Sequence, residues 1–240
     1  MTDQIEISQE TLDLLGRAST ATLTTQLWHH GIRNTFLSGL APLNKEHCRF
    51  VGEAVTLRYI PSREDLDRVE DYGNREHPQR KAIEMVGPGQ VLVIDCRGET
   101  RAASAGNILT TRLRVRGAAG LVTDGALRDS PDIGRQPFPV FARAAAAPMS
   151  MVVHHAVDIN VPIGCAGTAV FPGDILVGDE EGVVVVPRRL AAEIAKPAAE
   201  QEEKEVFILE KIEAGAPLRG TYPPDEKTLA EYEEWRKKQK

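Results

Sequence analysis

The chain has 240 residues, of which 42% are hydrophobic and 27% charged, and it carries a formal net charge of −6. A chain of this length can bury a sizeable core within one domain, and the composition is that of a globular protein. The acidic balance argues against nucleic-acid partners, which favour a basic surface, and no apolar run is long enough to span a membrane.

Two further features predict a cytoplasmic protein. The first ten residues, MTDQIEISQE, are acidic and polar, unlike a signal peptide. The three cysteines, Cys48, Cys96 and Cys165, are far apart and odd in number, so they fit neither a disulfide framework nor a zinc site.

The first half of the chain predicts alternating helices and strands. Residues 8–30 have helical spacing, with a break near Ser19-Thr20 and a stop at Gly31. The charged segment 62–73 predicts a short helix or an active-site flap, in which Arg63 suits a second carboxylate or hydroxyls. Strands are expected at 50–60, 90–95 and 119–123, with a helix at 107–116 between the last two.

The second half predicts strands followed by a helix. Residues 138–186 are rich in short apolar runs typical of strands. Residues 188–215 predict a helix that Pro197 kinks or divides. Residues 216–240 predict a polar, solvated tail, so that residues 1–240 form a single domain.

The stretch GLVTDGALRDSPDI at residues 120–133 lies where a ligand is expected. Strand 90–95, helix 107–116 and strand 119–123 predict a right-handed crossover between parallel strands. Ligands of such sheets bind beyond the carboxyl ends of the strands. Arg128 suits a carboxylate, and Asp129 suits Mg²⁺ or Mn²⁺.

The start of the helix at 107–116 predicts an anion site beside that pair. Asn107 is a favourable N-cap residue, which would leave the N–H groups of Ile108 and Leu109 free at the positive helix end. A small acid is therefore the expected ligand.

The core GNILTTRLRVRGAAGLVTDGALRD resembles the Gly-x-x-Gly-x-Val-x-Asp-Gly-x-x-Arg-Asp pattern of the RraA-like/4-hydroxy-4-methyl-2-oxoglutarate aldolase family. These proteins are class II, metal-dependent pyruvate aldolases and their non-enzymatic relatives. The resemblance extends over roughly residues 15–220, through LAPLNKEHCRFVGEAVTLRYIP, FPGDILVGDEEGVVVVPRRL and EEKEVFILEKIEAG. It implies an α/β fold, a swivelling β/β/α domain with a C-terminal helix. It also implies a homotrimer or homohexamer with active sites between subunits.

The resemblance also implies roles for individual residues. Asp129 would bind the divalent metal, Mg²⁺ or Mn²⁺, and Arg128 would hold the substrate and stabilise a pyruvate enolate. The backbone amides of Ile108 and Leu109, in the substrate-binding stretch that begins at Gly106, would bind the substrate carboxylate.

The family pattern does not assign a residue at two places in this sequence. Asn107 stands where the family has an acidic residue that holds the metal through water, and an amide brings no charge. Either Glu202 or Glu203 resembles the acidic residue that reaches in from a neighbouring subunit.

Three functions follow as hypotheses. The first is a metal-dependent lyase that cleaves or decarboxylates a 2-oxo acid through a pyruvate enolate. The second is a dehydratase or lyase of a 2-keto-3-deoxy sugar acid, which Asn107 and the segment 62–73 favour. The third is a non-catalytic regulator that binds a ribonuclease. The Arg-Asp pair favours the enzymes, although Arg128 and Asp129 could form a structural ion pair and Asp124 could simply shape the turn.

Overall fold

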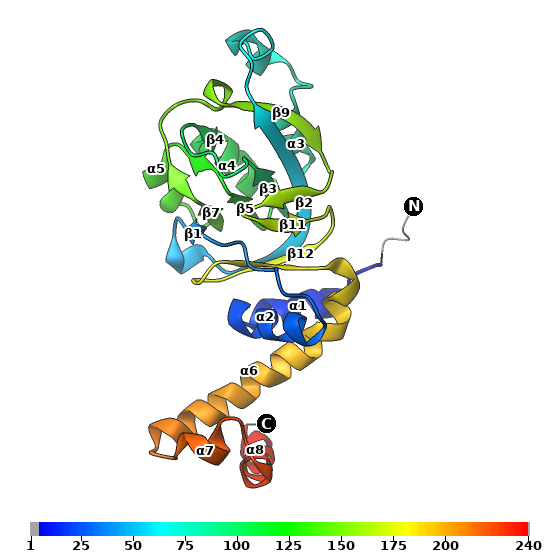
Figure 1. Ribbon diagram of the computed structural model, residues 1–240, viewed down its shortest axis with the longest axis vertical. Coiled ribbons are helices and arrows are strands. Elements are labelled where there is room, and N and C mark those ends of the chain that lie inside the picture. The colour runs from blue at the N-terminus through cyan, green and yellow to red at the C-terminus, as the bar shows by residue number, and fades with distance from the viewer. Residues whose placement is uncertain (1–4, 240) are drawn as a thin grey trace.

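The computed structural model describes residues 5–239, whose main mixed sheet has helices on both sides (Figure 1). The strands of the protein are β1 (Ala41–Pro42), β2 (Phe50–Pro61), β3 (Gln90–Asp95), β4 (Ala103–Ala105), β5 (Gly120–Thr123), β6 (Ala126–Leu127), β7 (Val140–Ala142), β8 (Ala144–Ala145), β9 (His154–Ile159), β10 (Ile163–Cys165), β11 (Thr168–Val170), β12 (Ile175–Gly178) and β13 (Val183–Val186). The helices are α1 (Gln9–Arg17), α2 (Thr20–His29), α3 (Pro78–Met85), α4 (Asn107–Val115), α5 (Ser130–Gly134), α6 (Ala191–Glu213), α7 (Leu218–Thr221) and α8 (Glu226–Lys238). Short 3-10 turns lie at Lys45–His47, Val69–Gly73, Ser150–Val152 and Arg188–Leu190.

The main sheet has the order β1-β7-β5-β3-β2-β12-β13, and β9 also pairs with β2. The pairs β2–β3, β3–β5 and β5–β7 are parallel, whereas β12, β13 and β9 run antiparallel to their neighbours. The predicted crossover from β3 through α4 to β5 is therefore confirmed. A small parallel sheet, β4-β6-β8, lies at the carboxyl ends of these strands.

Alternation along each buried strand divides the core into two faces. Leu92 and Ile94 of β3 pack with α3 and α4 on one face, in a cluster that includes Ile83 and Leu113. Val93 lies on the other face, beneath the β10–β11 hairpin. A third cluster packs α1, α2 and the start of α6 against β12 and β13. This arrangement confirms the α/β class predicted from the sequence.

The N-terminal helices form as predicted. The expected break between α1 and α2 lies at Ser19. Its side chain accepts a hydrogen bond from the N–H of Thr22 and caps α2. In segment 62–73 only Val69–Gly73 is helical, as one 3-10 turn.

The C-terminal region differs from the prediction in two ways. α6 runs unbroken past Pro197, which lies on an exposed face where water can bind the carbonyl that loses its partner. The polar segment predicted at 216–240 contains a helix that the sequence did not indicate, α8, which packs against α6. Tyr232 is buried on Phe207 and Ile208, with Trp235 beside it. The arm of α6, α7 and α8 extends away from the sheet in Figure 1.

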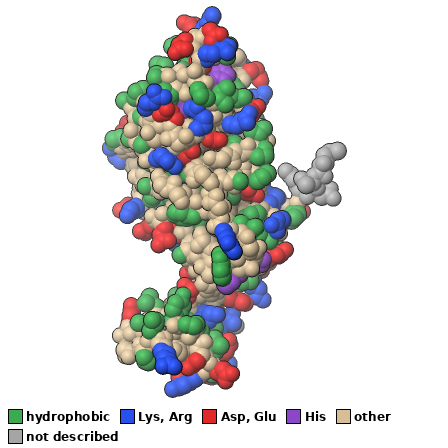
Figure 2. All heavy atoms as spheres, viewed as in Figure 1, with side chains coloured by type: hydrophobic (Ala, Val, Ile, Leu, Met, Phe, Trp, Pro, Cys, Tyr) green, Lys and Arg blue, Asp and Glu red, His purple; other side chains and the backbone are tan. Residues whose placement is uncertain are grey.

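Acidic and basic side chains are interspersed over the face that Figure 2 shows. No helix between residues 5 and 239 is both long and apolar enough to cross a bilayer.

Candidate active site

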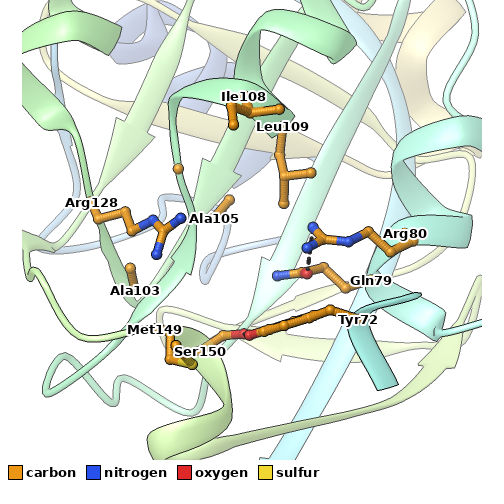
Figure 3. Close-up of a pocket in the computed structure, with 11 residues that line it drawn as sticks. Tyr72, Gln79, Arg80, Ala103, Ala105, Ile108, Leu109, Arg128, Met149 and Ser150 are labelled. Atoms are coloured by element: carbon orange, nitrogen blue, oxygen red, sulfur yellow. Dashed lines mark hydrogen bonds between the residues drawn. The ribbon is translucent and has the colours of Figure 1, made fainter. Parts of the chain in front are cut away.

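A cavity of about 380 Å³ opens where α3, the start of α4 and the β4-β6-β8 sheet meet (Figure 3). Four of the predicted site residues line it: Gly106, Ile108, Leu109 and Arg128. The cavity lies at the carboxyl ends of the parallel strands, as the sequence predicted.

Gly106, and not Asn107, is the N-cap of α4. Its extended backbone, with φ −137° and ψ −174°, leads directly into Asn107 as the first helical residue. The prediction of Asn107 as N-cap is therefore wrong by one residue. Gly106 has no side chain to cap the helix, and the side chain of Asp129, distant in sequence, takes this role. The N–H of Asn107 donates to Oδ2 of Asp129 at 3.1 Å.

The helix end predicted as an anion site has backbone N–H groups available to a ligand. The N–H groups of Ile108 and Leu109 have no acceptor among the described residues, whereas the N–H of Thr110 donates to the carbonyl of Gly106. Free N–H groups and the helix dipole together favour a negatively charged ligand.

The side chain of Asn107 does not cap α4 and is hydrogen-bonded elsewhere. Its Oδ1 accepts a hydrogen bond from Nε2 of Gln136 and lies 3.5 Å from Oγ1 of Thr111. The amide oxygen is therefore already bound within the chain. Gln136 follows α5, far from Asn107 in sequence, and no local pattern indicated it.

Arg128 lines the cavity, and Asp129 lies beside it at the start of α4. The N–H of Arg128 donates to the carbonyl of Ala105 at 3.1 Å, which places Arg128 beside β4. Its Nε lies 3.7 Å from Oδ2 of Asp129, and both side chains are about half exposed. Asp129 has φ 57° and ψ 27°, a left-handed conformation that is costly for most residues and frequent at functional sites.

Gly106 is required because Arg128 and Asp129 approach its backbone closely. A Cβ atom there would lie 2.8 Å from Oδ2 of Asp129 and 2.9 Å from Nε of Arg128. The glycine thus lets the guanidinium of Arg128 and the carboxylate of Asp129 reach the N-terminal end of α4.

The residues present fit a divalent metal bound through one carboxylate. No cluster of three or more His, Cys, Asp or Glu residues between positions 5 and 239 could hold a metal by itself. Asp129 uses Oδ2 for Asn107, whereas its Oδ1 has no hydrogen-bond partner in the described chain. Mg²⁺ often takes one or two carboxylates and completes its octahedron with water and substrate oxygens.

Asp124, the other carboxylate of the motif, is structural. It is 2% exposed and accepts hydrogen bonds from the N–H groups of Cys96, Gly98 and Ala166. Burial raises the pKa of its carboxyl. The carboxylate therefore ties its own turn to the loop after β3 and to the turn between β10 and β11.

Glu202 and Glu203 lie on α6, which leaves the sheet on the opposite side from α3 and α4 (Figure 1). Oε1 of Glu202 accepts from the N–H of Ser19 at 2.7 Å. Burial works to raise the pKa of Glu202, but the hydrogen bonds from α2 outweigh it and hold the pKa below its ordinary value. Glu203 accepts from the hydroxyl of Tyr232 at 3.0 Å. The structure does not bring either residue to its own chain's cavity.

Sequence reasoning missed the wall opposite Arg128, which α3 and two short turns supply. Tyr72, Gln79, Arg80 and Ser150 line the cavity there. A guanidinium suited to a second anion was expected on Arg63. Arg63 instead binds Asp65 on the exposed loop, with Nε 2.6 Å from Oδ1.

Comparison with known proteins places this arrangement in a family. The RraA-like (Aldolase/RraA) family model matches residues 20–185. A putative 4-hydroxy-4-methyl-2-oxoglutarate aldolase from Halalkalibacterium halodurans is 33% identical over 74% of this chain and 80% of its own. A 4-hydroxy-4-methyl-2-oxoglutarate aldolase from Thermus thermophilus is 35% identical over 58% of this chain and 76% of its own.

A solved structure resembles the whole fold. Streptomyces coelicolor RraAS2, described as an unusual member of the RNase ES inhibitor RraA protein family, superposes with a TM-score of 0.75 at 31% identity. The match covers 85% of this chain and 97% of that one. The chain therefore belongs to the RraA-like family, and the predicted RraA-like fold, a single α/β domain with a C-terminal helix, is confirmed.

Proposed function

We propose that this protein is a lyase that cleaves a carbon–carbon bond of a 2-oxo acid with the help of a divalent metal. One observation carries the proposal: Arg128, Ile108 and Leu109 line one cavity of about 380 Å³, and Asp129 lies directly beside Arg128 and the start of α4. The names of the aldolases from Halalkalibacterium halodurans and Thermus thermophilus support the same reaction class.

Substrate binding begins at the start of α4. The N–H groups of Ile108 and Leu109 donate to the carboxylate of the 2-oxo acid, and the helix dipole adds to the attraction. Arg128 directs its guanidinium at the adjoining ketone oxygen. When the carbon–carbon bond breaks, negative charge develops there, and a fixed guanidinium stabilises the pyruvate enolate more than the ground state.

Asp129 is the residue that would hold Mg²⁺ or Mn²⁺, through its uncommitted Oδ1. When bound, the metal supplies a Lewis acid next to the ketone oxygen. Asp129 also orients the end of α4 through the N–H of Asn107, so one side chain would position both the cation and the anion site.

A proton must also be moved, and the cavity lining of this chain includes no carboxylate and no imidazole. We propose that a neighbouring copy supplies Glu202 or Glu203, in a homotrimer or homohexamer. Each residue would then exchange its present partner, Ser19 or Tyr232, for the substrate. Glu202→Gln and Glu203→Gln separate the two candidates by their effects on turnover.

The test is pyruvate release from oxaloacetate and from 4-hydroxy-4-methyl-2-oxoglutarate, measured with Mg²⁺, with Mn²⁺ and with EDTA. Metal-dependent release from either substrate, removed by EDTA, supports the proposal. Release only from a 2-keto-3-deoxy sugar acid, or loss of water from it, would favour the dehydratase or lyase alternative.

A second candidate function is regulation of a ribonuclease, favoured by the structural likeness to RraAS2. It requires no turnover. Inhibition of a ribonuclease by a protein that releases no pyruvate from any of these acids would support it.

A further inference from the structure

The cavity wall away from the start of α4 carries a pair of hydroxyl groups. Tyr72 lies in the 3-10 turn before α3, and Ser150 begins the 3-10 turn before β9. Their hydroxyl oxygens are 2.7 Å apart, and both residues line the cavity. Figure 3 shows the hydroxyl of Tyr72 pointing toward Ser150, on the side of the cavity away from Ile108 and Leu109.

Three contacts hold the side chain of Tyr72. Its hydroxyl is bound to Ser150, which is buried. The guanidinium carbon of Arg80 lies over its ring, 4.8 Å from the ring centre, and the ring of His77 packs on it with 5.7 Å between centroids. Arg80 is held in turn, because its Nη1 donates to Oε1 of the buried Gln79 at 3.1 Å. The hydroxyl of Tyr72 therefore has a defined position at the cavity.

Tyr72 is the strongest acid able to give up its proton among the described residues that line the cavity. No carboxylate and no imidazole is among them. The guanidinium groups of Arg80 and Arg128 stay protonated, and the amide of Gln79 does not ionise. A phenol is also a stronger acid than the alcohol of Ser150.

Arg80 suits the form of Tyr72 that remains after a proton has left. The negative charge of a tyrosinate extends over the ring, so a cation above the ring attracts the tyrosinate more than the neutral phenol. No acidic residue of the described cavity lining offsets the charge of Arg80. The hydroxyl of Ser150 can also donate to the tyrosinate oxygen.

The orientation proposed for the substrate directs its reacting carbon toward this hydroxyl pair. The carboxylate binds the N–H groups of Ile108 and Leu109, and the ketone oxygen faces Arg128. The third carbon, at which the carbon–carbon bond breaks, then extends toward the opposite side of the cavity, where the hydroxyl of Tyr72 lies (Figure 3).

We propose that Tyr72 is the catalytic acid that protonates the pyruvate enolate, and that Ser150 is its positioning residue. This assignment rests on the proposed function. The glutamate of a neighbouring copy takes the proton of the substrate hydroxyl as the carbon–carbon bond breaks, and the electron pair of that bond forms the enolate. The third carbon of the enolate then takes the hydroxyl proton of Tyr72, which yields pyruvate and a tyrosinate. Ser150 passes a proton from water to the tyrosinate, and the glutamate returns its proton to water.

The test follows exchange of the methyl hydrogens of pyruvate with D₂O by proton NMR, with Mg²⁺ present. By microscopic reversibility, the group that protonates the enolate also removes a methyl proton from pyruvate, so exchange reports this step without bond cleavage. The variants are Tyr72→Phe and Ser150→Ala, with Tyr222→Phe as the matched control. Tyr222 is 54% exposed and directly follows α7, on the C-terminal arm.

We expect Tyr72→Phe to slow exchange about 100-fold or more, because a positioned general acid–base group contributes at least that much to a rate. Calorimetry should give a dissociation constant for pyruvate within about twofold of the wild type, because phenylalanine keeps the ring beside Arg80. Ser150→Ala should slow exchange about tenfold through the lost hydrogen bond, and Tyr222→Phe should match the wild type. With 4-hydroxy-4-methyl-2-oxoglutarate as substrate, Tyr72→Phe should lower kcat more than it raises KM.

Exchange at the wild-type rate in Tyr72→Phe would overturn the assignment. A loss of exchange matched by an equal loss of pyruvate affinity would also overturn it, because Tyr72 would then only shape the cavity. Circular dichroism and thermal unfolding check the fold of each variant. If Tyr72→Phe unfolds, wild-type exchange in a folded Ser150→Ala protein would overturn the assignment instead.

Failure of the proposed function gives a different result. A wild type that exchanges pyruvate hydrogens through Tyr72 but releases no pyruvate from any 2-oxo acid would refute the lyase and keep the role of Tyr72. A wild type that releases pyruvate without catalysing exchange would refute the role of Tyr72 alone, and a wild type that does neither would refute both.

Discussion

Replacement of Gly106 by alanine tests whether the close approach of Arg128 and Asp129 to α4 matters for activity. The added Cβ would lie 2.8–2.9 Å from three side-chain atoms of these residues. Ordinary contacts need roughly half an ångström more, so both side chains must move. They are 45% and 43% exposed and can shift into solvent. The free energy of unfolding should therefore fall by only about 1 kcal/mol, the low end for overpacking.

The loss of activity should be much larger than the loss of stability. Misplacement of reacting groups by 1 Å can cost about 100-fold in rate, so a shift of about half that size predicts a 10- to 100-fold loss in kcat/KM. Pyruvate release coupled to NADH oxidation measures activity, and urea unfolding measures stability. Gly164→Ala is the control, because its Cβ would meet no atom within 4 Å and its φ is not positive. Wild-type kcat/KM in a folded Gly106→Ala protein would refute the geometry proposed for the site.

Three other changes test separate parts of the structure. Arg128→Lys keeps the charge but loses the planar fork, so kcat/KM should fall about 10²- to 10³-fold with circular dichroism unchanged; near-normal turnover would make Arg128 structural. Asp124→Asn cannot accept from all three of its N–H donors, so urea unfolding should show a loss of about 2–3 kcal/mol, and a change below about 0.5 kcal/mol would contradict its role. Light scattering should return a trimer or hexamer at micromolar concentration, since Val206 and Leu209 remain exposed on α6; a stable 26 kDa monomer would exclude a site shared between subunits.

The sequence predicted the part of the site that local chemistry determines. Apolar runs identified β3 and β5, and the segment between them had helical spacing, so the crossover followed from general rules of chain topology. That crossover is enough to bring Arg128 and Asp129 near the start of α4. The boundary of α4 was misplaced by one residue, because the group that caps it, Asp129, comes from another segment.

The rest of the site depends on contacts between segments that no local pattern connects. α3 is short, and its residue Arg80 looks like one of many exposed basic residues in the sequence. Arg80 is held at the cavity by Tyr72 and by Gln79, which in turn binds the carbonyl of Ser104. Helix α8 was missed for a related reason. Tyr232 and Trp235 occur in a strongly charged stretch, and their burial depends on Phe207 of α6.

Asn107 is the position where the chain departs from the family's acidic residue, and Asn107→Asp tests what this departure does. Aspartate keeps an oxygen acceptor for Gln136, and a negative charge in the first turn of α4 suits the helix dipole. A carboxylate behind a metal-bound water would attract a divalent cation by about 1–2 kcal/mol more than an amide, or roughly tenfold in the dissociation constant. Asn107→Asp should therefore reach half-maximal activity at a lower Mg²⁺ concentration, and calorimetry should give a lower dissociation constant for Mg²⁺. Asn74→Asp, an exposed residue whose oxygen accepts only from the N–H of Glu76, is the matched charge control. Identical Mg²⁺ titrations in wild type and Asn107→Asp would mean that the metal does not bind beside Asn107, and that Asp129 serves the end of α4 alone.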